Sequence, residues 1–151
     1  MNYQQQTIDT PVNCSGIGVH SGRTVNLTIK PAPINHGIRF VRTDLPGQPG
    51  VTAHFNNVVD TSLATVIGAE GCIVSTVEHL MAGMSIDNAI VEVDAYELPI
   101  MDGSAGPFTR LIKSAGTRPQ EGRKCYFKVN QTICLAEDGK SVTINPADEF
   151  R

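Results

Sequence analysis

Alternation of apolar and polar residues predicts most of the strands in this chain. Residues 25–30 alternate and run directly into Pro31, which is typical of a strand stopped by proline. Residues 37–42 alternate again, and the link 34–37 between the two segments favours a hairpin turn. Short apolar or alternating segments predict further strands at 64–67, 72–74, 89–94, 126–135 and 141–144.

Helical spacing of apolar residues occurs at two places. The first helix is predicted to open at Ser75, where Ser-x-x-Glu is a capping box, and its apolar face consists of positions 77, 80, 81 and 84. The second is predicted to start with Pro107 in its first turn and to stop at Gly116. Strands before and between only two helices favour an α+β fold, a two-layer domain in which helices cover one face of an antiparallel or mixed sheet.

The composition changes after the second predicted helix. Residues 115–124 are polar and rich in glycine and proline, which predicts a linker. Beyond the linker, the strands 126–135 and 141–144 form a predicted hairpin, because Asp138 and Gly139 between them are a strong turn signal.

Two parts of this hairpin resemble the start of the chain. Residues 131–133 are similar to 6–8, and residues 142–147 are similar to 27–32. Our hypothesis is a first domain over 1–125 and a second domain of similar design over 126–151, truncated after its first hairpin. The alternative is a chance similarity between short β-segments. A two-stranded hairpin alone in water is only marginally stable, so we expect this one to pack against the first domain or a neighbouring molecule.

Composition places the chain among soluble globular proteins. Of its 151 residues, 40% are hydrophobic and 18% are charged, and the net charge of −3 argues against a nucleic-acid partner. The chain shows neither a secretory signal nor a transmembrane segment. Its cysteines lack C-x-x-C spacing and are interpreted as small buried residues in a reducing compartment. These features predict a cytoplasmic protein.

Glu78 and His79 are the first candidates for chemistry. A metal-assisted hydrolase needs one group to hold the ion and another to take a proton from its bound water. Both residues lie away from the predicted apolar helix face, so they point out of the core of this domain. The residues alone leave alternatives open, because Glu78 also fits a helix cap and His79 also fits a surface histidine.

The sequence predicts only half of a zinc site. A catalytic zinc needs about three protein ligands and an open position for water. The other histidines are His20, His36 and His54, and no histidine in the sequence belongs to an H-x-x-x-H or H-x-x-x-D pattern. One imidazole cannot hold a catalytic zinc tightly.

The glycine-dense segment 16–22 has two interpretations. It could bring backbone close to a phosphate, or it could connect two strands with glycines that supply positive φ. The order G-x-G-x-x-G is missing and no helix follows, which excludes a dinucleotide-binding fold. The sequence also has neither a P-loop nor G-x-S-x-G, so serine hydrolase chemistry is disfavoured.

Four motifs occur in a characteristic order: residues 16–22 (GIGVHSG), 75–80 (STVEHL), 86–88 (IDN) and 99–105 (PIMDGSA). Together they resemble the N-terminal half of the UDP-3-O-acyl-N-acetylglucosamine deacetylase family, zinc amidases of lipid A biosynthesis. The resemblance covers nearly the whole chain. It implies two similar domains, each a sheet with two helices, and an active site between them.

The resemblance also implies roles for individual residues. Glu78 would be the general base and His79 the zinc ligand, while His20, Leu63 and Ala64 would line the substrate site. Zinc would be the cofactor and a UDP-sugar lipid precursor the substrate. The family's other zinc ligands, a His-x-x-x-Asp pair, its histidine general acid and its acyl-chain passage belong to the second domain and are missing here.

The sequence departs from the family in one further respect. The link between His79 and Ile86 is about three residues shorter than usual, nearly one helical turn. Because the ligands of the second domain are missing, we expect an N-terminal amidase domain that is inactive alone and that associates through the truncated hairpin. The alternative is a non-catalytic fragment or paralogue that binds a sugar nucleotide or a protein partner.

Overall fold

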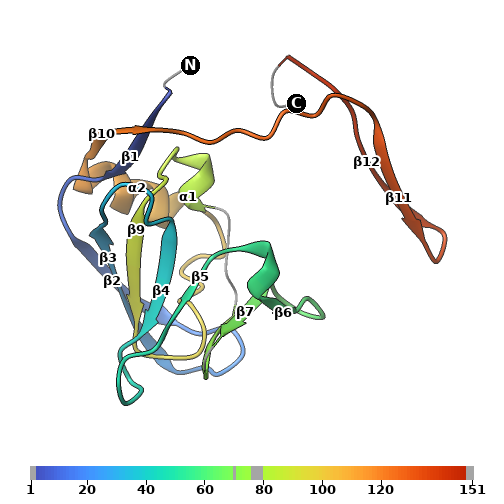
Figure 1. Ribbon diagram of the computed structural model, residues 1–151. Coiled ribbons are helices and arrows are strands. Elements are labelled where there is room, and N and C mark those ends of the chain that lie inside the picture. The colour runs from blue at the N-terminus through green and yellow to red at the C-terminus, as the bar shows by residue number, and fades with distance from the viewer. Residues whose placement is uncertain (1–2, 70, 76–79, 149–151) are drawn as a thin grey trace.

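The centre of the molecule is a mixed five-stranded sheet with the order β2-β3-β9-β4-β5 (Figure 1). The computed structural model describes residues 3–69, 71–75 and 80–148. The strands of this sheet are β2 (Val12–Ile17), β3 (Thr24–Pro31), β4 (Ile38–Arg42), β5 (Gly50–Thr52) and β9 (Ala89–Val93). Neighbouring strands run antiparallel except β4 and β9, which are parallel.

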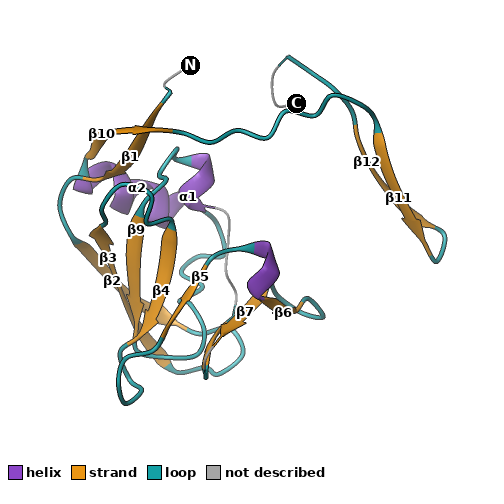
Figure 2. Ribbon diagram, in the orientation of Figure 1, coloured by secondary structure: helices purple, strands orange, loops and turns teal. Residues whose placement is uncertain are grey.

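The other described strands form smaller sheets, and short helices lie beside the main sheet (Figure 2). The remaining strands are β1 (Gln4–Ile8), β6 (Val58–Asp60), β7 (Val66–Ala69), β8 (Cys72–Val74), β10 (Thr117–Arg123), β11 (Ile133–Glu137) and β12 (Lys140–Ile144). The helices are the 3-10 turn η1 (Phe55–Asn57), α1 (Leu80–Gly83) and α2 (Gly106–Ala115). The predicted α+β class is confirmed. Within the described residues, no helix is both long enough and apolar enough to span a membrane.

The predicted hairpin at 34–37 is wrong, because β3 and β4 do not pair with each other. Strand β9 lies between them and pairs with both, so that Val91 faces Ile29 on one side and Phe40 on the other. Three alternate residues of β9 are buried, as a strand covered on one face requires. The link between β3 and β4 therefore passes the end of β9 at which Ala89 lies.

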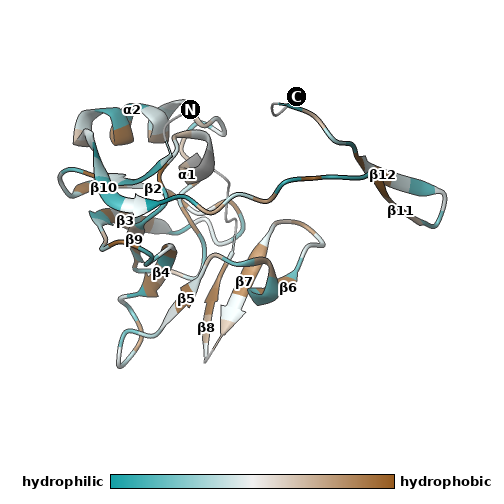
Figure 3. Cartoon of the chain, turned by 45° about the horizontal axis from the view of Figure 1, so that its top comes forward, coloured by the Kyte–Doolittle hydropathy of each residue, from teal (hydrophilic) through white to brown (hydrophobic). Residues whose placement is uncertain are grey.

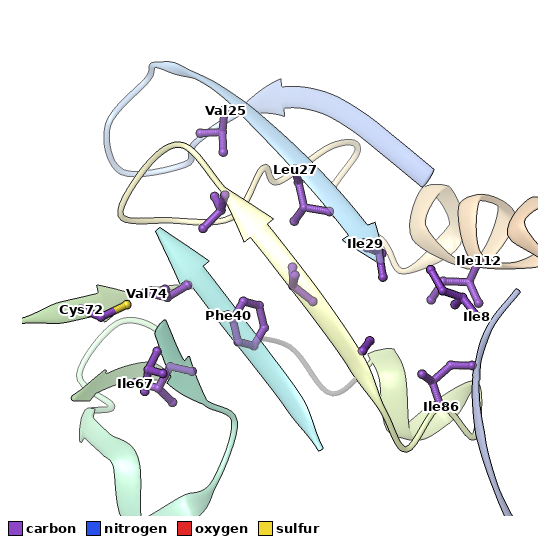
Figure 4. Packing of buried hydrophobic residues seen from close by; sticks show 14 of the residues in the cluster. Ile8, Val25, Leu27, Ile29, Phe40, Ile67, Cys72, Val74, Ile86 and Ile112 are labelled. Carbon is purple, nitrogen blue, oxygen red and sulfur yellow. The ribbon is translucent and has the colours of Figure 1, made fainter. Parts of the chain in front are cut away.

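One contiguous core joins the sheet, the helices and the strand β8 (Figure 4). Its buried members include Ile8, Leu27, Ile29, Phe40, Cys72, Val74, Val91, Val93, Ile112 and Ala115. Helix α2 contributes the last two of these and begins and ends as predicted. It has Pro107 in its first turn and Gly116 at its C-terminus with φ of 70°.

The predicted linker is a strand instead. Residues Thr117–Arg123 form β10, which pairs antiparallel with β1. A proline is tolerated in this two-stranded pair because Pro119 need not donate to a further strand. The side chain of Asn88 fastens the pair to the main sheet by donating to the Oε1 atoms of Gln5 and Gln120, both at 2.8 Å.

Asp87 ties down the same region with its carboxylate. Its Oδ2 accepts from the backbone N–H of Gln6 at 2.7 Å and lies 2.9 Å from the ammonium of Lys124. That ammonium also donates to the carbonyl of Ser85 at 3.1 Å. With Ile86 buried in the core, the 86–88 motif is structural: it attaches β1 and β10 to the domain.

The hairpin β11–β12 stands apart from this body at the end of an extended segment, as two views show (Figures 1 and 3). Its turn is the predicted one, with φ of 48° at Asp138 and 75° at Gly139, the two positive values of a type I′ turn. Every residue of both strands is exposed. The two strands pair as predicted, but β11 begins at Ile133 and not at 126, and the described residues provide no core for the hairpin.

Candidate functional site

The two residues expected to perform the chemistry, Glu78 and His79, lie outside the described residues. Of the predicted capping box, Ser75 is described and Glu78 is not. The described chain reaches this segment at Ser75 and leaves it at Leu80. The surroundings of Ser75 therefore define the described part of the candidate site.

Ser75 is held by the strand-like segment that follows β9. Its backbone N–H donates to the carbonyl of Tyr96 at 2.7 Å, and its carbonyl accepts from the N–H of Leu98 at 3.2 Å. This parallel bridge pairs Ser75 with Glu97. Ser75 itself is buried, with 7% of its surface exposed. The chain thus enters segment 76–79 from a fixed point.

Glu97 connects this point to the His20 loop, the segment 18–23 between β2 and β3. Its side chain is fully buried, and its two oxygens accept separate backbone hydrogen bonds. Oε2 accepts from the N–H of His20 at 3.0 Å, and Oε1 accepts from the N–H of Ser21 at 2.7 Å. A buried carboxylate with two charge-assisted bonds therefore fixes the backbone that carries His20.

The environment of Glu97 keeps it ionised. Burial by itself raises the pKa of this carboxyl, but hydrogen bonds from the Ser21 hydroxyl and from the His20 and Ser21 backbone outweigh burial. The net result is a pKa below the usual value for glutamate. Sequence analysis missed this residue, since its partners are backbone groups that leave no side-chain pattern to detect.

The glycines of segment 16–22 allow this segment to pack closely against residues 97–101 of the same chain. A Cβ on Gly16 would lie 2.8 Å from Sδ of Met101, and a Cβ on Gly18 would collide with the carboxylate of Glu97. Gly22 has φ of 65° and turns the chain toward β3. The interpretation as a strand-connecting loop is confirmed, and the space beside Gly18 belongs to Glu97.

The 99–105 motif lies against the same loop and leads into α2. The N–H of Ile100 donates to the carbonyl of Ile17 at 2.9 Å. Further on, Oδ1 of Asp102 accepts from the N–H of Ser104 at 2.9 Å and from its hydroxyl at 2.7 Å. The Ser104 hydroxyl lowers the pKa of Asp102. Asp102 thus shapes the turn before the helix.

Leu63 and Ala64 belong to the link between β6 and β7. They precede β7, whose Ile67 pairs with Val74 at the end of β8. The start of β7 therefore lies beside the end of β8 from which the chain continues to Ser75. Leu63 is 87% exposed. No hydrogen bond among the described residues joins Leu63 or Ala64 to His20.

The described residues do not complete a metal site. Within 3–69, 71–75 and 80–148, no group of three or more His, Cys, Asp or Glu side chains could hold an ion. His36 contacts the carbonyl of Gly37, and Nδ1 of His54 accepts from the N–H of Asn56, so both have local structural roles. The four cysteines are free thiols; Cys72 is buried as predicted, but the prediction is wrong for Cys125 and Cys134, which are exposed. Zinc would need His79 together with ligands that the described residues do not offer.

Comparison with known proteins agrees with the motif order. The family model for UDP-3-O-acyl N-acetylglycosamine deacetylase matches residues 5–151. Proteins named UDP-3-O-acyl-N-acetylglucosamine deacetylase are similar along nearly the whole chain. The relative from Myxococcus xanthus is 48% identical over 99% of this chain and 49% of its own length. The relative from Chromohalobacter salexigens is 46% identical over 98% of this chain and 50% of its own length.

These matches place the chain in one half of a longer architecture. It spans about half the length of the curated relatives that it matches, including a third from Syntrophus aciditrophicus at 44% identity. The match includes the loop of His20, the bridge at Ser75 and the 99–105 turn. On this evidence of sequence and arrangement, the chain belongs to the UDP-3-O-acyl N-acetylglycosamine deacetylase family, LpxC.

Proposed function

We propose that this chain is the N-terminal half of a zinc-dependent amidase that removes the acetyl group from UDP-3-O-acyl-N-acetylglucosamine in lipid A biosynthesis. The observation that carries the proposal is the convergence at Ser75. The His20 loop is held there through Glu97, and the Leu63–Ala64 segment arrives through the β7–β8 pairing. Ser75, the last described residue before segment 76–79, is thus linked to the His20 loop through Glu97 and follows the strand that pairs with β7.

The roles that we propose follow from the family. Glu78 is the general base that takes the proton of the attacking water, and His79 contributes one zinc ligand. His20, Leu63 and Ala64 contact the UDP-sugar substrate. When bound, zinc polarises an acyl carbonyl and makes a water molecule more acidic. Water adds to the acetamide carbon, the C–N bond breaks, and acetate and a free amine result.

Activity requires the other half of the protein in this proposal. A single imidazole from His79 leaves at least two zinc ligands to be supplied, and the described residues offer no cluster that supplies them. The chain alone is therefore inactive. We propose that 1–125 is the first domain and that 126–151 begins the second, whose remainder covers the exposed apolar side chains of the hairpin. We also propose a cytoplasmic location.

The decisive experiment joins this chain to the C-terminal half of the Myxococcus xanthus relative. Deacetylation of UDP-3-O-acyl-N-acetylglucosamine is measured for the joined protein, for this chain alone and for the intact relative. We expect activity in the joined protein, its loss on chelation of zinc, and its loss in Glu78→Ala. The chain alone is expected to release no acetate.

Two results would contradict the proposal. Acetate release by the chain alone would show that it needs no second half. An inactive joined protein beside an active relative would favour the alternative, a non-catalytic module. In that case the chain is expected to bind UDP-N-acetylglucosamine or a protein partner without turning it over, which calorimetry with the nucleotide sugar measures.

A further inference from the structure

Glu97 is a buried carboxylate to which the proposed mechanism gives no task. Its surface exposure is 0%, in a segment that otherwise contributes apolar packing and backbone pairing. Burial of an ionised carboxylate is costly unless strong hydrogen bonds compensate it. An apolar residue of similar size would fill the same space without that cost, so the retained charge points to a specific partner.

The partners of Glu97 are the backbone amides of the loop that carries His20. Each carboxylate oxygen accepts one N–H, at 3.0 Å from His20 and at 2.7 Å from Ser21. The contact spans 77 and 76 positions of sequence, so no local turn rule produces it. Gly18 leaves the space that the carboxylate occupies, since a Cβ there would overlap it.

Glu97 also pairs with Ser75, the last described residue before segment 76–79. One residue therefore contacts the loop of His20 through its side chain and the entry to Glu78 and His79 through its backbone. A shift of its side chain would move His20 while leaving the Ser75 bridge in place. A substitution of the Glu97 side chain therefore tests the positioning of His20 without removing the backbone bridge to Ser75.

We infer that Glu97 is a positioning residue, which fixes the His20 loop relative to Ser75 so that His20 faces the substrate. The inference rests on the proposed function. Glutamine cannot substitute for Glu97, because its NH2 group would face one of the two N–H donors. Aspartate keeps the charge and both acceptors but withdraws them by one methylene.

The first test needs only this chain. Amide protons that donate to a carboxylate resonate downfield and exchange slowly, so the His20 and Ser21 amides are followed by NMR in wild type, Glu97→Gln and Glu97→Asp. Both signals are expected to move upfield and to exchange faster in Glu97→Gln. The matched control is Glu92→Gln on β9, whose carboxylate contacts Lys30 and not the loop. Unchanged His20 and Ser21 amides in Glu97→Gln would overturn the inference.

The second test is a double-mutant cycle in the protein joined to the second half. Glu97→Gln is expected to lower kcat/KM by about tenfold, the loss of roughly one buried hydrogen bond. Combined with His20→Ala it is expected to cost nothing beyond His20→Ala alone, because Glu97 acts through His20. Glu97→Asp should recover part of the activity, and Glu92→Gln should retain all of it.

The outcomes separate the two proposals. Additive losses in the cycle, or a His20→Ala variant with full activity, would overturn the positioning role of Glu97. If the joined wild-type protein is inactive, the proposed function fails, and the amide signals still decide whether Glu97 holds the loop. If Glu97→Gln does not fold, Glu97→Asp is used in the same cycle, with melting temperature as the check on folding.

Discussion

The hairpins β2–β3 and β11–β12 end in strands of similar sequence, β3 and β12, but these two strands differ in burial. Ile29 in β3 and Ile144 in β12 each stand directly before an x-Pro-Ala sequence. Ile29 is 1% exposed and Ile144 is 51% exposed. Strand β3 has β9 as a neighbour and a core above it, whereas β12 pairs with β11 alone. Alternation therefore selects a strand and its apolar face, and burial depends on what covers that face.

The largest effect is expected from the same substitution in the two hairpins. Ile29→Ala removes side-chain volume from the packed core and should lower the free energy of unfolding by about 3 kcal/mol. Ile144→Ala removes atoms that are largely in water and should change it by less than about 0.5 kcal/mol. Urea unfolding of both variants measures the difference. Equal losses would mean that β11–β12 shares the core of the first domain.

The next effect concerns the amide network at the boundary between the two regions. Asn88 is buried and donates to Gln5 and Gln120, so Asn88→Ala leaves buried acceptors and the Gly37 N–H unsatisfied. We expect a loss of about 2 kcal/mol in the free energy of unfolding. Hydrogen exchange should show that β10 opens first.

The control for this network is Asn26→Ala, because Asn26 is an exposed amide that contacts Asp94 on the surface. Its effect should stay within about 0.5 kcal/mol. If the two variants were equally stable, the 86–88 motif would not be the attachment of β1 and β10 that the hydrogen bonds indicate.

A smaller effect is expected from pH. The pKa of Glu97 lies below the usual 4.5, so the folded state binds its proton less readily than the unfolded state does. The stabilisation is complete above that usual value and is lost as the pH falls through the lowered one. Urea unfolding between pH 7 and pH 3 should show a shallower decline for Glu97→Gln than for wild type.

The exposed hairpin supplies the comparison for the pH experiment. Glu137→Gln in β11 should decline with pH as wild type does, because β11–β12 takes no part in the cooperative unfolding of the core. A parallel decline for Glu97→Gln and wild type would show that Glu97 contributes nothing to acid sensitivity.

Local patterns predicted local structure well in this chain. Alternation identified β3, β9 and the β11–β12 hairpin, and proline and glycine marked both ends of α2. Strand pairing could not be predicted from local patterns, because the insertion of β9 between β3 and β4 depends on contacts across the whole sheet. Strand β10 was missed because its proline and glycine signal a linker, while side-chain amides from distant segments hold it in place.

In the candidate site, too, local motifs were predicted from the sequence and long-range contacts were not. Segment 75–80 and the glycine loop were found because they are local motifs. Glu97 was not found, because a carboxylate that binds backbone amides 76 and 77 positions away has no characteristic neighbours in sequence. The spatial relation between these motifs needed the structure.

The smallest effect is expected at the turns of the two hairpins. Gly22 and Gly139 have φ of 65° and 75°, and nothing lies within 4 Å of a Cβ built on either. Substitution by alanine therefore costs only backbone strain, about 1 kcal/mol at positive φ. Gly22→Ala should lower the free energy of unfolding by about that amount, because β2–β3 belongs to the cooperative core. Gly139→Ala should leave it unchanged within about 0.5 kcal/mol and reduce only the hairpin population, which the Leu135 and Val142 amide shifts report. Equal losses in the free energy of unfolding would mean that β11–β12 unfolds together with the core, and the two hairpins would then differ only in exposure.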